Sequence, residues 1–205
     1  MRASAAAGTP WVVAHDEQAP AGLGVPPDPG YQGFNGNDAQ GNPIHSLHDV
    51  RKYTLWGNLM AGGAGVEYYF GYGLPQNDLI GEDFRSRDKS WDYAAIALDF
   101  MKTQRIPFWE MSNADVLVGN SANENTRYCL AKAGDVYLVY LPTGGSADLD
   151  LTGVSGTLSV NWFDPRHGGA LKRGSVASVT GGRSVALGMP PDNPGDDWLV
   201  VVRRN

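Results

Sequence analysis

The feature that most constrains the fold lies after about residue 112, where short apolar segments alternate with glycine-containing turns. Short segments rich in β-branched and aromatic residues, spaced ~8–12 residues apart with turns between them, are typical of an antiparallel β-sandwich. The sequence therefore predicts a β-sandwich domain over residues 112–205. Its strands are expected near residues 115–118, 127–132, 135–141, 147–151, 157–163, 175–179, 183–187 and 197–203.

Residues 1–111 follow a different pattern, in which short strands alternate with helices. Strands are expected around Val13 and Val66, and amphipathic helices over residues 46–61 and 91–104. Two parallel strands do not make a stable fold alone, because parallel sheets are covered by helices on both faces. The pattern suits the last two β/α units of a (β/α)8 barrel. The predicted fold class is α+β, a partial (β/α)8 barrel followed by an antiparallel β-sandwich.

The first predicted helix follows an unusually long loop. Residues 18–45 are rich in glycine and proline but also contain Tyr31 and Phe34. Loops longer than ~12–15 residues are usually either functional or disordered. Ser46 and Asp49 then have the spacing of a capping box, which predicts where the helix begins.

The composition excludes several classes of protein. A net charge of −6 argues against a nucleic-acid partner, which requires a basic surface. No segment approaches the ~18 apolar residues of a membrane span, and the N-terminus lacks the apolar region of a signal peptide. The single cysteine, Cys129, excludes an internal disulfide and is expected to be buried and inert. His15 and His48 lack the further ligands of a zinc site, so neither a metal nor a cofactor is expected.

Acidic residues follow the predicted strands of the first region. Asp16 and Glu17 end the strand around Val13, and Glu67 lies in or at the end of the strand around Val66. Active-site residues of (β/α)8 barrels lie at the carboxyl ends of the strands. These are the positions where a barrel glycosidase holds a carboxylate. Because neighbouring strand residues face opposite ways, only one of Asp16 and Glu17 can face the cleft.

Several sequence blocks carry a more specific resemblance, which extends from about residue 8 to the end of the chain. The blocks are residues 11–18 (WVVAHDEQ), 55–67 (LWGNLMAGGAGVE), 78–88 followed by Trp91, 128–131 (YCLA), 136–142 (VYLVYLP), 160–166 (VNWFDPR) and 197–200 (DWLV). They occur in the order found in apiosidase-like glycoside hydrolases, which this chain resembles. In that family a (β/α)8 barrel precedes a small β-sandwich that is often described as a collagen-binding domain.

The resemblance implies the hydrolysis of a glycosidic bond in a polysaccharide or oligosaccharide. Glu17 matches the position of the catalytic nucleophile, with Asp16 as the second choice, whereas the acid/base carboxylate of the family has no counterpart here. Retaining hydrolysis needs two carboxyl groups ~5–5.5 Å apart, so the chain is not expected to be catalytically complete alone. The family's barrel has six further β/α units before this point, which makes Met1 an expected internal or artificial start. The parent protein is expected to be secreted or periplasmic.

Four further residues are candidates for substrate contact, namely His15, Glu67, Tyr69 and Tyr72. For Glu67 the alternative is an ion pair with Arg51, Arg85 or Arg87. For the aromatic residues between 68 and 72, the favoured interpretation is a cluster that packs on Trp91, and a sugar-stacking platform is the alternative. The alternating charges of residues 82–88 predict an ion-pair network that holds this loop.

Two functional classes remain open. The first is the C-terminal part of a glycoside hydrolase with a carbohydrate substrate. The second is a non-catalytic module whose β-sandwich binds carbohydrate or matrix protein, to which Trp162, Phe163 and Trp198 would contribute. Strand alternation places at least one of Trp162 and Phe163 in the core. The apolar faces of the two predicted helices would lack their barrel partners, which also predicts association between copies of the chain.

Overall fold

The computed structural model describes residues 13–15, 20, 22–76 and 84–204, which divide into two compact units. The N-terminal unit comprises Trp11–Leu59 and Gly63–Ala95. The C-terminal unit contains Met60–Gly62 and Ile96–Asn205. Each unit is described by itself.

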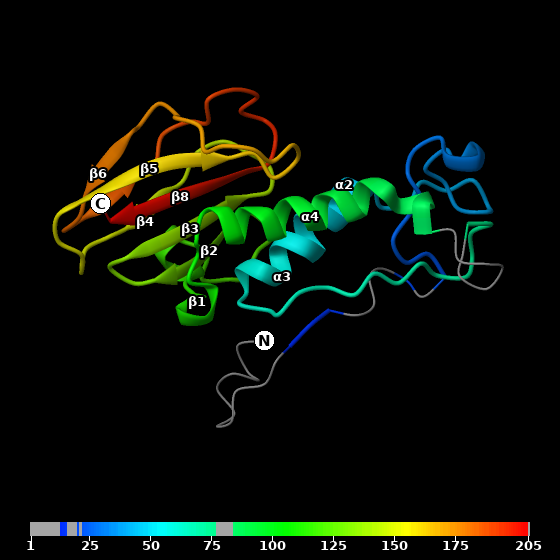
Figure 1. Ribbon diagram of the computed structural model, residues 1–205, viewed down its shortest axis with the longest axis horizontal. Helices are drawn as coiled ribbons and strands as arrows, with labels where there is room; N and C mark the ends of the chain where they lie inside the picture. Colours follow the sequence, from blue (N-terminus) through cyan, green and yellow to red (C-terminus); the bar gives the residue numbers. More distant parts are fainter. Residues whose placement is uncertain (1–12, 16–19, 21, 77–83, 205) are drawn as a thin grey trace. The chain divides into compact units, whose positions relative to one another are not determined.

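In the N-terminal unit, the predicted helix over residues 46–61 is present and begins where its sequence indicates. Helical turns cover α2 (Leu47–Asp49), the π-helical segment η2 (Val50–Trp56) and α3 (Gly57–Met60) (Figure 1). Ser46 and Asp49 form the predicted capping box, because each side chain accepts a hydrogen bond from the backbone N–H of the other. The buried side chains Leu47, Val50, Leu55 and Trp56 give this helical segment its apolar face.

The second predicted helix is α4 (Asp88–Thr103), which follows the short 3₁₀ turn η4 (Phe84–Arg87). It begins three residues before its predicted start at residue 91. The other 3₁₀ turn in the described part of this unit is η1 (Tyr31–Gly33), within the long loop. No helix in the described part of the chain has the length and apolar character needed to cross a bilayer.

The predicted parallel pairing between the segments around Val13 and Val66 is present as one parallel bridge, His15 with Val66. Three backbone hydrogen bonds surround it, from Ala64 N to Val13 O (2.8 Å), from His15 N to Gly65 O (3.2 Å) and from Glu67 N to His15 O (2.8 Å). The pairing is shorter than a regular strand. It shows that the two segments run in the same direction, as consecutive strands of a β/α fold do.

The C-terminal unit contains a six-stranded antiparallel sheet in the order β1-β2-β3-β8-β5-β6 and a two-stranded sheet, β4-β7 (Figure 1). The strands are β1 (Ser112–Asn113), β2 (Tyr128–Lys132), β3 (Val136–Leu141), β4 (Asp148–Asp150), β5 (Thr157–Phe163), β6 (Ser178–Thr180), β7 (Ser184–Ala186) and β8 (Trp198–Arg204). The chain is thus a mixed α and β protein with an antiparallel sheet, as predicted.

One cluster of buried side chains forms the core of this unit. The central strands β3 and β8 pair in register, with Leu138 opposite Val201. The six-stranded sheet contributes Val139, Trp162 and Val200 to the cluster, and the two-stranded sheet contributes Leu149 and Val185. Cys129 is also buried there, as predicted, and burial raises the pKa of its thiol.

One predicted strand is wrong. Residues 115–118 form the 3₁₀ turn η6 (Asp115–Val118), which ends at Gly119 in the left-handed conformation. The side chain of Asp115 is buried and accepts a hydrogen bond from Cys129 N (2.6 Å), the kind of bond that a strand partner would otherwise provide. A second 3₁₀ turn, η5 (Phe108–Glu110), precedes β1.

Candidate functional site

The candidate site lies in the N-terminal unit, where two loops follow the paired segments. The loop after His15 returns along the segment that follows Val66, and Val25 N donates to Tyr69 O (2.6 Å). Gly73 N donates in turn to Gly22 O (2.6 Å). The two backbones touch so closely that a Cβ atom at Gly24 would overlap the carbonyl of Tyr69. Glycine is therefore required at this contact.

The buried side chain of Arg87 forms hydrogen bonds to both of these loops. Its side chain is fully buried, and the guanidinium donates to Val25 O (3.0 Å), Phe70 O (3.2 Å) and Gln76 O (2.6 Å). The guanidinium carbon also lies 4.4 Å from the centre of the Phe70 ring. The planar group with its five donors suits three carbonyl acceptors from two segments. Arg87 thus joins the segments that follow the two paired strands.

This role differs in part from the predicted ion-pair network of residues 82–88. Arg87 bonds to main-chain carbonyls and to Ser86 Oγ (2.6 Å), whereas Glu82 and Asp83 lie outside the described residues. Asp28 also links two segments of this unit, because its Oδ2 accepts a hydrogen bond from Lys89 N (3.1 Å) in the first turn of α4. Burial raises the pKa of Asp28, and this effect outweighs the hydrogen bond from Lys89.

Two of the aromatic residues after Val66, Tyr68 and Phe70, pack on Trp91, as the favoured interpretation predicts. The ring centres of Tyr68 and Phe70 lie 5.2 Å and 5.9 Å from that of Trp91. Trp91 Nε1 donates to Phe84 O (2.9 Å), and burial raises the pKa of Tyr68 to about 12. These rings therefore hold the loop in place by packing on one another.

The predicted site residues divide into those that the structure describes and those that it does not. Asp16 and Glu17 lie outside the described residues. His15 and Glu67 are both exposed and lie side by side through the bond from Glu67 N to His15 O. Tyr69 is half-buried, and Tyr72 is 58% exposed. The structure therefore links the backbones of two of the four predicted contact residues, whereas the bridge partner of His15 is Val66.

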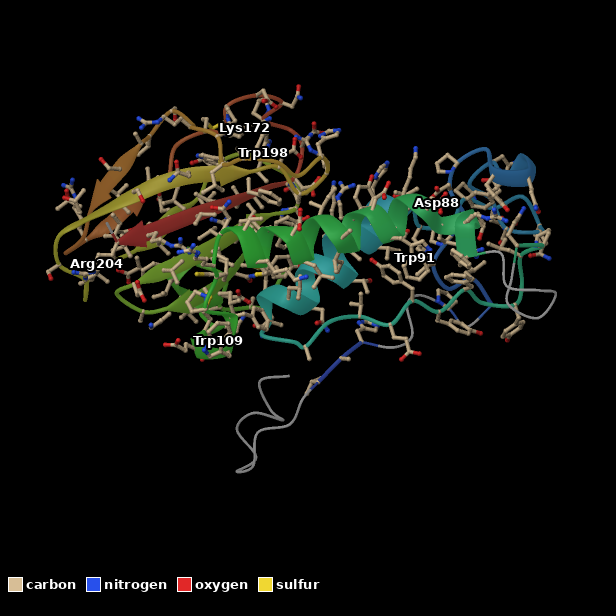
Figure 2. All side chains as sticks on the ribbon, viewed as in Figure 1. Asp88, Trp91, Trp109, Lys172, Trp198 and Arg204 are labelled. Atoms are coloured by element: carbon tan, nitrogen blue, oxygen red, sulfur yellow. The ribbon has the colours of Figure 1, made fainter. Side chains whose placement is uncertain are left out.

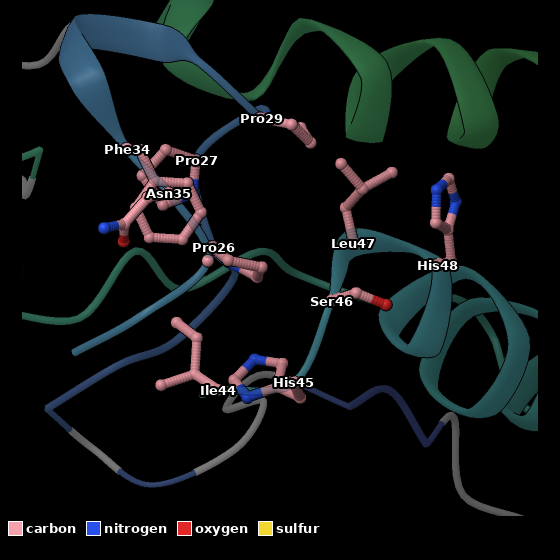
Figure 3. Close-up of a pocket in the computed structure, with 11 residues that line it drawn as sticks. Pro26, Pro27, Pro29, Phe34, Asn35, Ile44, His45, Ser46, Leu47 and His48 are labelled. Atoms are coloured by element: carbon pink, nitrogen blue, oxygen red, sulfur yellow. The ribbon is translucent and has the colours of Figure 1, made fainter. Parts of the chain in front are cut away.

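Sequence reasoning missed a pocket of about 250 Å³ in the long loop and the start of the helix (Figure 3). Its walls include the rings of Pro26, Pro27 and Phe34 together with Ile44 and Leu47, and the polar residues at its edge include His45 and His48. The signal available in the sequence was Phe34, an aromatic residue within a glycine- and proline-rich loop. No described group of three or more His, Cys, Asp and Glu residues could hold a metal ion.

The C-terminal unit contains an ionic cluster around the buried carboxylate of Asp164. Arg166 donates to both carboxylate oxygens of Asp164 (2.8 Å and 3.0 Å) and also pairs with Asp196. Burial alone would raise the pKa of Asp164, but hydrogen bonds from Arg166 and His167 hold it at about 2. The Arg166 guanidinium carbon lies 5.1 Å from the centre of a Trp198 ring.

The three aromatic residues proposed for a binding face are all buried. Trp162 and Trp198 are 0% exposed and Phe163 is 2% exposed, and Lys172 covers the Trp198 ring at 5.3 Å (Figure 2). Among the described aromatic residues of this unit, Trp109 is the most exposed, at 81%. Trp162, Phe163 and Trp198 therefore serve the core, and they do not form an exposed platform.

The C-terminal part of the chain is similar to a known family of protein domains. Residues 113–203, a little under half of the chain, match the family described as "Putative collagen-binding domain of a collagenase". No curated protein matches the chain.

Two solved structures are similar over more of the chain. One is a glycoside hydrolase family 5 protein from Bacteroides vulgatus ATCC 8482, with a TM-score of 0.61 at 17% identity over 80% of this chain and 37% of that one. The other is described as a glycoside hydrolase, with a TM-score of 0.62 at 17% identity over 83% of this chain and 40% of that one. The chain therefore shares the fold of part of these proteins and spans less than half of their length.

Proposed function

We propose that this chain is the C-terminal part of a glycoside hydrolase. In this proposal residues 1–111 supply the last two β/α units of a (β/α)8 barrel, and residues 112–205 form a β-sandwich that accompanies it. The parallel bridge between His15 and Val66 is the observation that carries the proposal, because it gives the chain direction that such a barrel requires. The similarity in fold to two glycoside hydrolases supports it.

The proposed chemistry uses a carboxylate at the end of the first paired segment. Glu17 follows His15 by two residues and is the proposed nucleophile, with Asp16 as the second choice. It would attack the anomeric carbon as a general acid protonates the leaving oxygen, and water would then hydrolyse the glycosyl-enzyme ester. The acid is not assigned to any residue of this chain, which is therefore proposed to be catalytically incomplete alone.

The proposed substrate contacts are on and after the two paired segments. His15 pairs with Val66, and the next residue, Glu67, donates its backbone N–H to His15 O; the polar side chains of both are proposed to bond to sugar hydroxyls. Tyr69 and Tyr72 lie on the loop that Arg87 and the Trp91 cluster hold in place. The proposed partners are a carbohydrate substrate and a second copy of the chain, associated through exposed surfaces of residues 1–111.

The test is a protein in which the reading frame upstream of Met1 is included. We expect that protein to hydrolyse at least one member of a polysaccharide panel, and Glu17→Gln to lower kcat by a factor on the order of 10³ or more. Asp16→Asn is the matched control and should lower kcat much less. Sodium azide should partly restore turnover to Glu17→Ala, because azide can attack in place of the missing carboxylate. Unchanged turnover in Glu17→Gln would remove Glu17 from the nucleophile role.

A binding module is the second candidate, because residues 113–203 match a family whose description names collagen. The same experiment separates the two. If the extended protein binds a polysaccharide or collagen fibres with no turnover of any substrate, the module is the better assignment. Turnover that depends on Glu17 supports the hydrolase.

A further inference from the structure

We propose that the pocket between Phe34 and Leu47 is a subsite that binds a single sugar ring. This inference rests on the proposed function for its ligand class and adds a site that the predicted residues do not include. Figure 3 shows Phe34 and Pro27 on one side of the pocket, with Leu47 facing them. All the lining residues belong to the N-terminal unit.

The size of the pocket limits the ligand. The pocket has a volume of about 250 Å³. It is smaller than the ~300–1,000 Å³ of sites that enclose drug-sized ligands. Its size therefore suits a single sugar ring with its hydroxyl groups.

The apolar wall suits one face of a sugar. Pro26 and Pro27 are buried and Phe34 is half-buried, so these rings are held in place by the loop. The face of an aromatic ring carries partial negative charge. The C–H groups on one face of a pyranose are weakly positive and flat, and they can lie against such a ring. Rigid proline and phenylalanine rings lose little conformational freedom when a ligand packs on them.

The two histidines at the edge present opposite hydrogen-bonding groups. His45 Nε2 lies 2.7 Å from the carbonyl oxygen of Gly24, so Nε2 carries the proton and Nδ1 is an acceptor in the neutral ring. His48 Nδ1 lies 2.9 Å from Arg51 Nη1, which can only donate, so the proton of His48 is on Nε2 and that atom is a donor. Both histidines line the pocket, and a neutral imidazole has one donor and one acceptor, which suits hydroxyl groups because they do both.

The position of the pocket connects it to the proposed active site. His45 bonds to Gly24, and the next residue, Val25, bonds to Tyr69 on the loop that follows the paired segment. The pocket is therefore fixed to the same backbone as Tyr69.

The experiment measures sugar binding by this chain directly, without turnover. Methyl glycosides of glucose, galactose, xylose and rhamnose are titrated and followed by saturation-transfer NMR. We expect at least one to bind with a millimolar Kd, and Phe34→Leu to weaken it about fivefold or more, since the aromatic face is lost. Phe34→Tyr keeps the ring and should stay within about twofold.

Phe84→Leu is the matched control, because Phe84 is 61% exposed in the same unit and does not line the pocket. It should bind the sugar as the unchanged chain does. If Phe34→Leu fails to fold by circular dichroism, His48→Ala serves instead, and it should weaken binding through the lost donor. The absence of binding by all four glycosides, or an equal loss in Phe34→Leu and Phe84→Leu, would overturn the subsite.

Failure of the subsite and failure of the hydrolase proposal give different results. If sugar binding depends on Phe34 but the extended protein hydrolyses no substrate, the subsite is supported and the hydrolase proposal is rejected. Glu17-dependent turnover whose KM does not change in Phe34→Leu removes the subsite alone.

Discussion

The two units of this protein are held together in different ways. In the C-terminal unit, a continuous ladder of backbone hydrogen bonds supports one apolar core that includes Trp162 and Trp198. In the described part of the N-terminal unit, strand pairing is limited to isolated bridges, and loops are fixed by backbone contact at glycine and by the buried Arg87. The difference shows that loops can be held in a defined arrangement by buried polar contacts where a continuous sheet is absent.

The comparison predicts that the C-terminal unit is sensitive to loss of core volume. Trp162→Ala should lower the free energy of unfolding of this unit by about 3–5 kcal/mol, since it removes a fully buried indole and leaves a cavity. Urea denaturation followed by hydrogen exchange of β5 and β8 measures it. Trp109→Ala, at an 81% exposed position, is the control and should cost less than about 0.5 kcal/mol. Equal effects of the two changes would show that the core does not depend on Trp162.

The N-terminal unit should depend instead on one polar side chain. Arg87→Met keeps much of the volume but leaves the carbonyls of Val25, Phe70 and Gln76 without their donor, at a cost of about 3 kcal/mol. Hydrogen-exchange mass spectrometry should show faster exchange in residues 22–30 and 68–76, with the six-stranded sheet unchanged. Arg85→Met, on the same turn but exposed, is the matched control. Faster exchange across both units would contradict the separation drawn here.

Asp164 in the C-terminal unit and Asp28 in the N-terminal unit should contribute to stability in acid with opposite signs. Asp164 has a folded-state pKa of about 2, below its ordinary value of 3.8, so its stabilising effect is complete above about pH 4 and is lost as the pH falls toward 2. Asp28 has a raised pKa in the folded state, so protonation favours that state and its region gains stability as the pH falls through that pKa.

Asn substitutions separate these effects. Asp164→Asn should cost about 2 kcal/mol at pH 7, because Arg166 loses a buried partner, and should flatten the pH dependence of the C-terminal unit below pH 4. Asp28→Asn should change the stability of the N-terminal unit by less than about 1 kcal/mol and remove the contribution of Asp28 that grows in acid. Stability measured from pH 7 to pH 2 checks both, and the same slope in the two variants would exclude the assignment.

The strands of the C-terminal unit could be predicted because their signals are local. Each has alternating or continuous apolar residues and a glycine turn beside it, and the structure places β2, β3, β5 and β8 within one or two residues of the prediction. The segment at 115–118 could not be predicted in the same way. Its apolar residues suit a strand, but the carboxylate of Asp115 takes the backbone donor of Cys129, a contact between residues 14 positions apart.

The N-terminal unit was predicted less completely because its loops depend on distant contacts. The capping box at Ser46 is local and was predicted, as was the parallel pairing near Val66. The burial of Arg87 was not, because its neighbours in sequence are charged whereas its partners lie up to 62 residues away. Glu17 lies outside the described residues, so its role stays a prediction.

The backbone contact at Gly24 has a practical consequence for protein engineering. The long loop is anchored at its base by that glycine and by the bond from Val25 to Tyr69, whereas the segment from Tyr31 to Gln40 is mostly exposed or half-buried. Replacing the exposed tip therefore leaves the anchor intact. A library confined to the tip can vary its surface without disturbing the anchor, whereas side chains introduced at Gly24 would clash with the carbonyl of Tyr69.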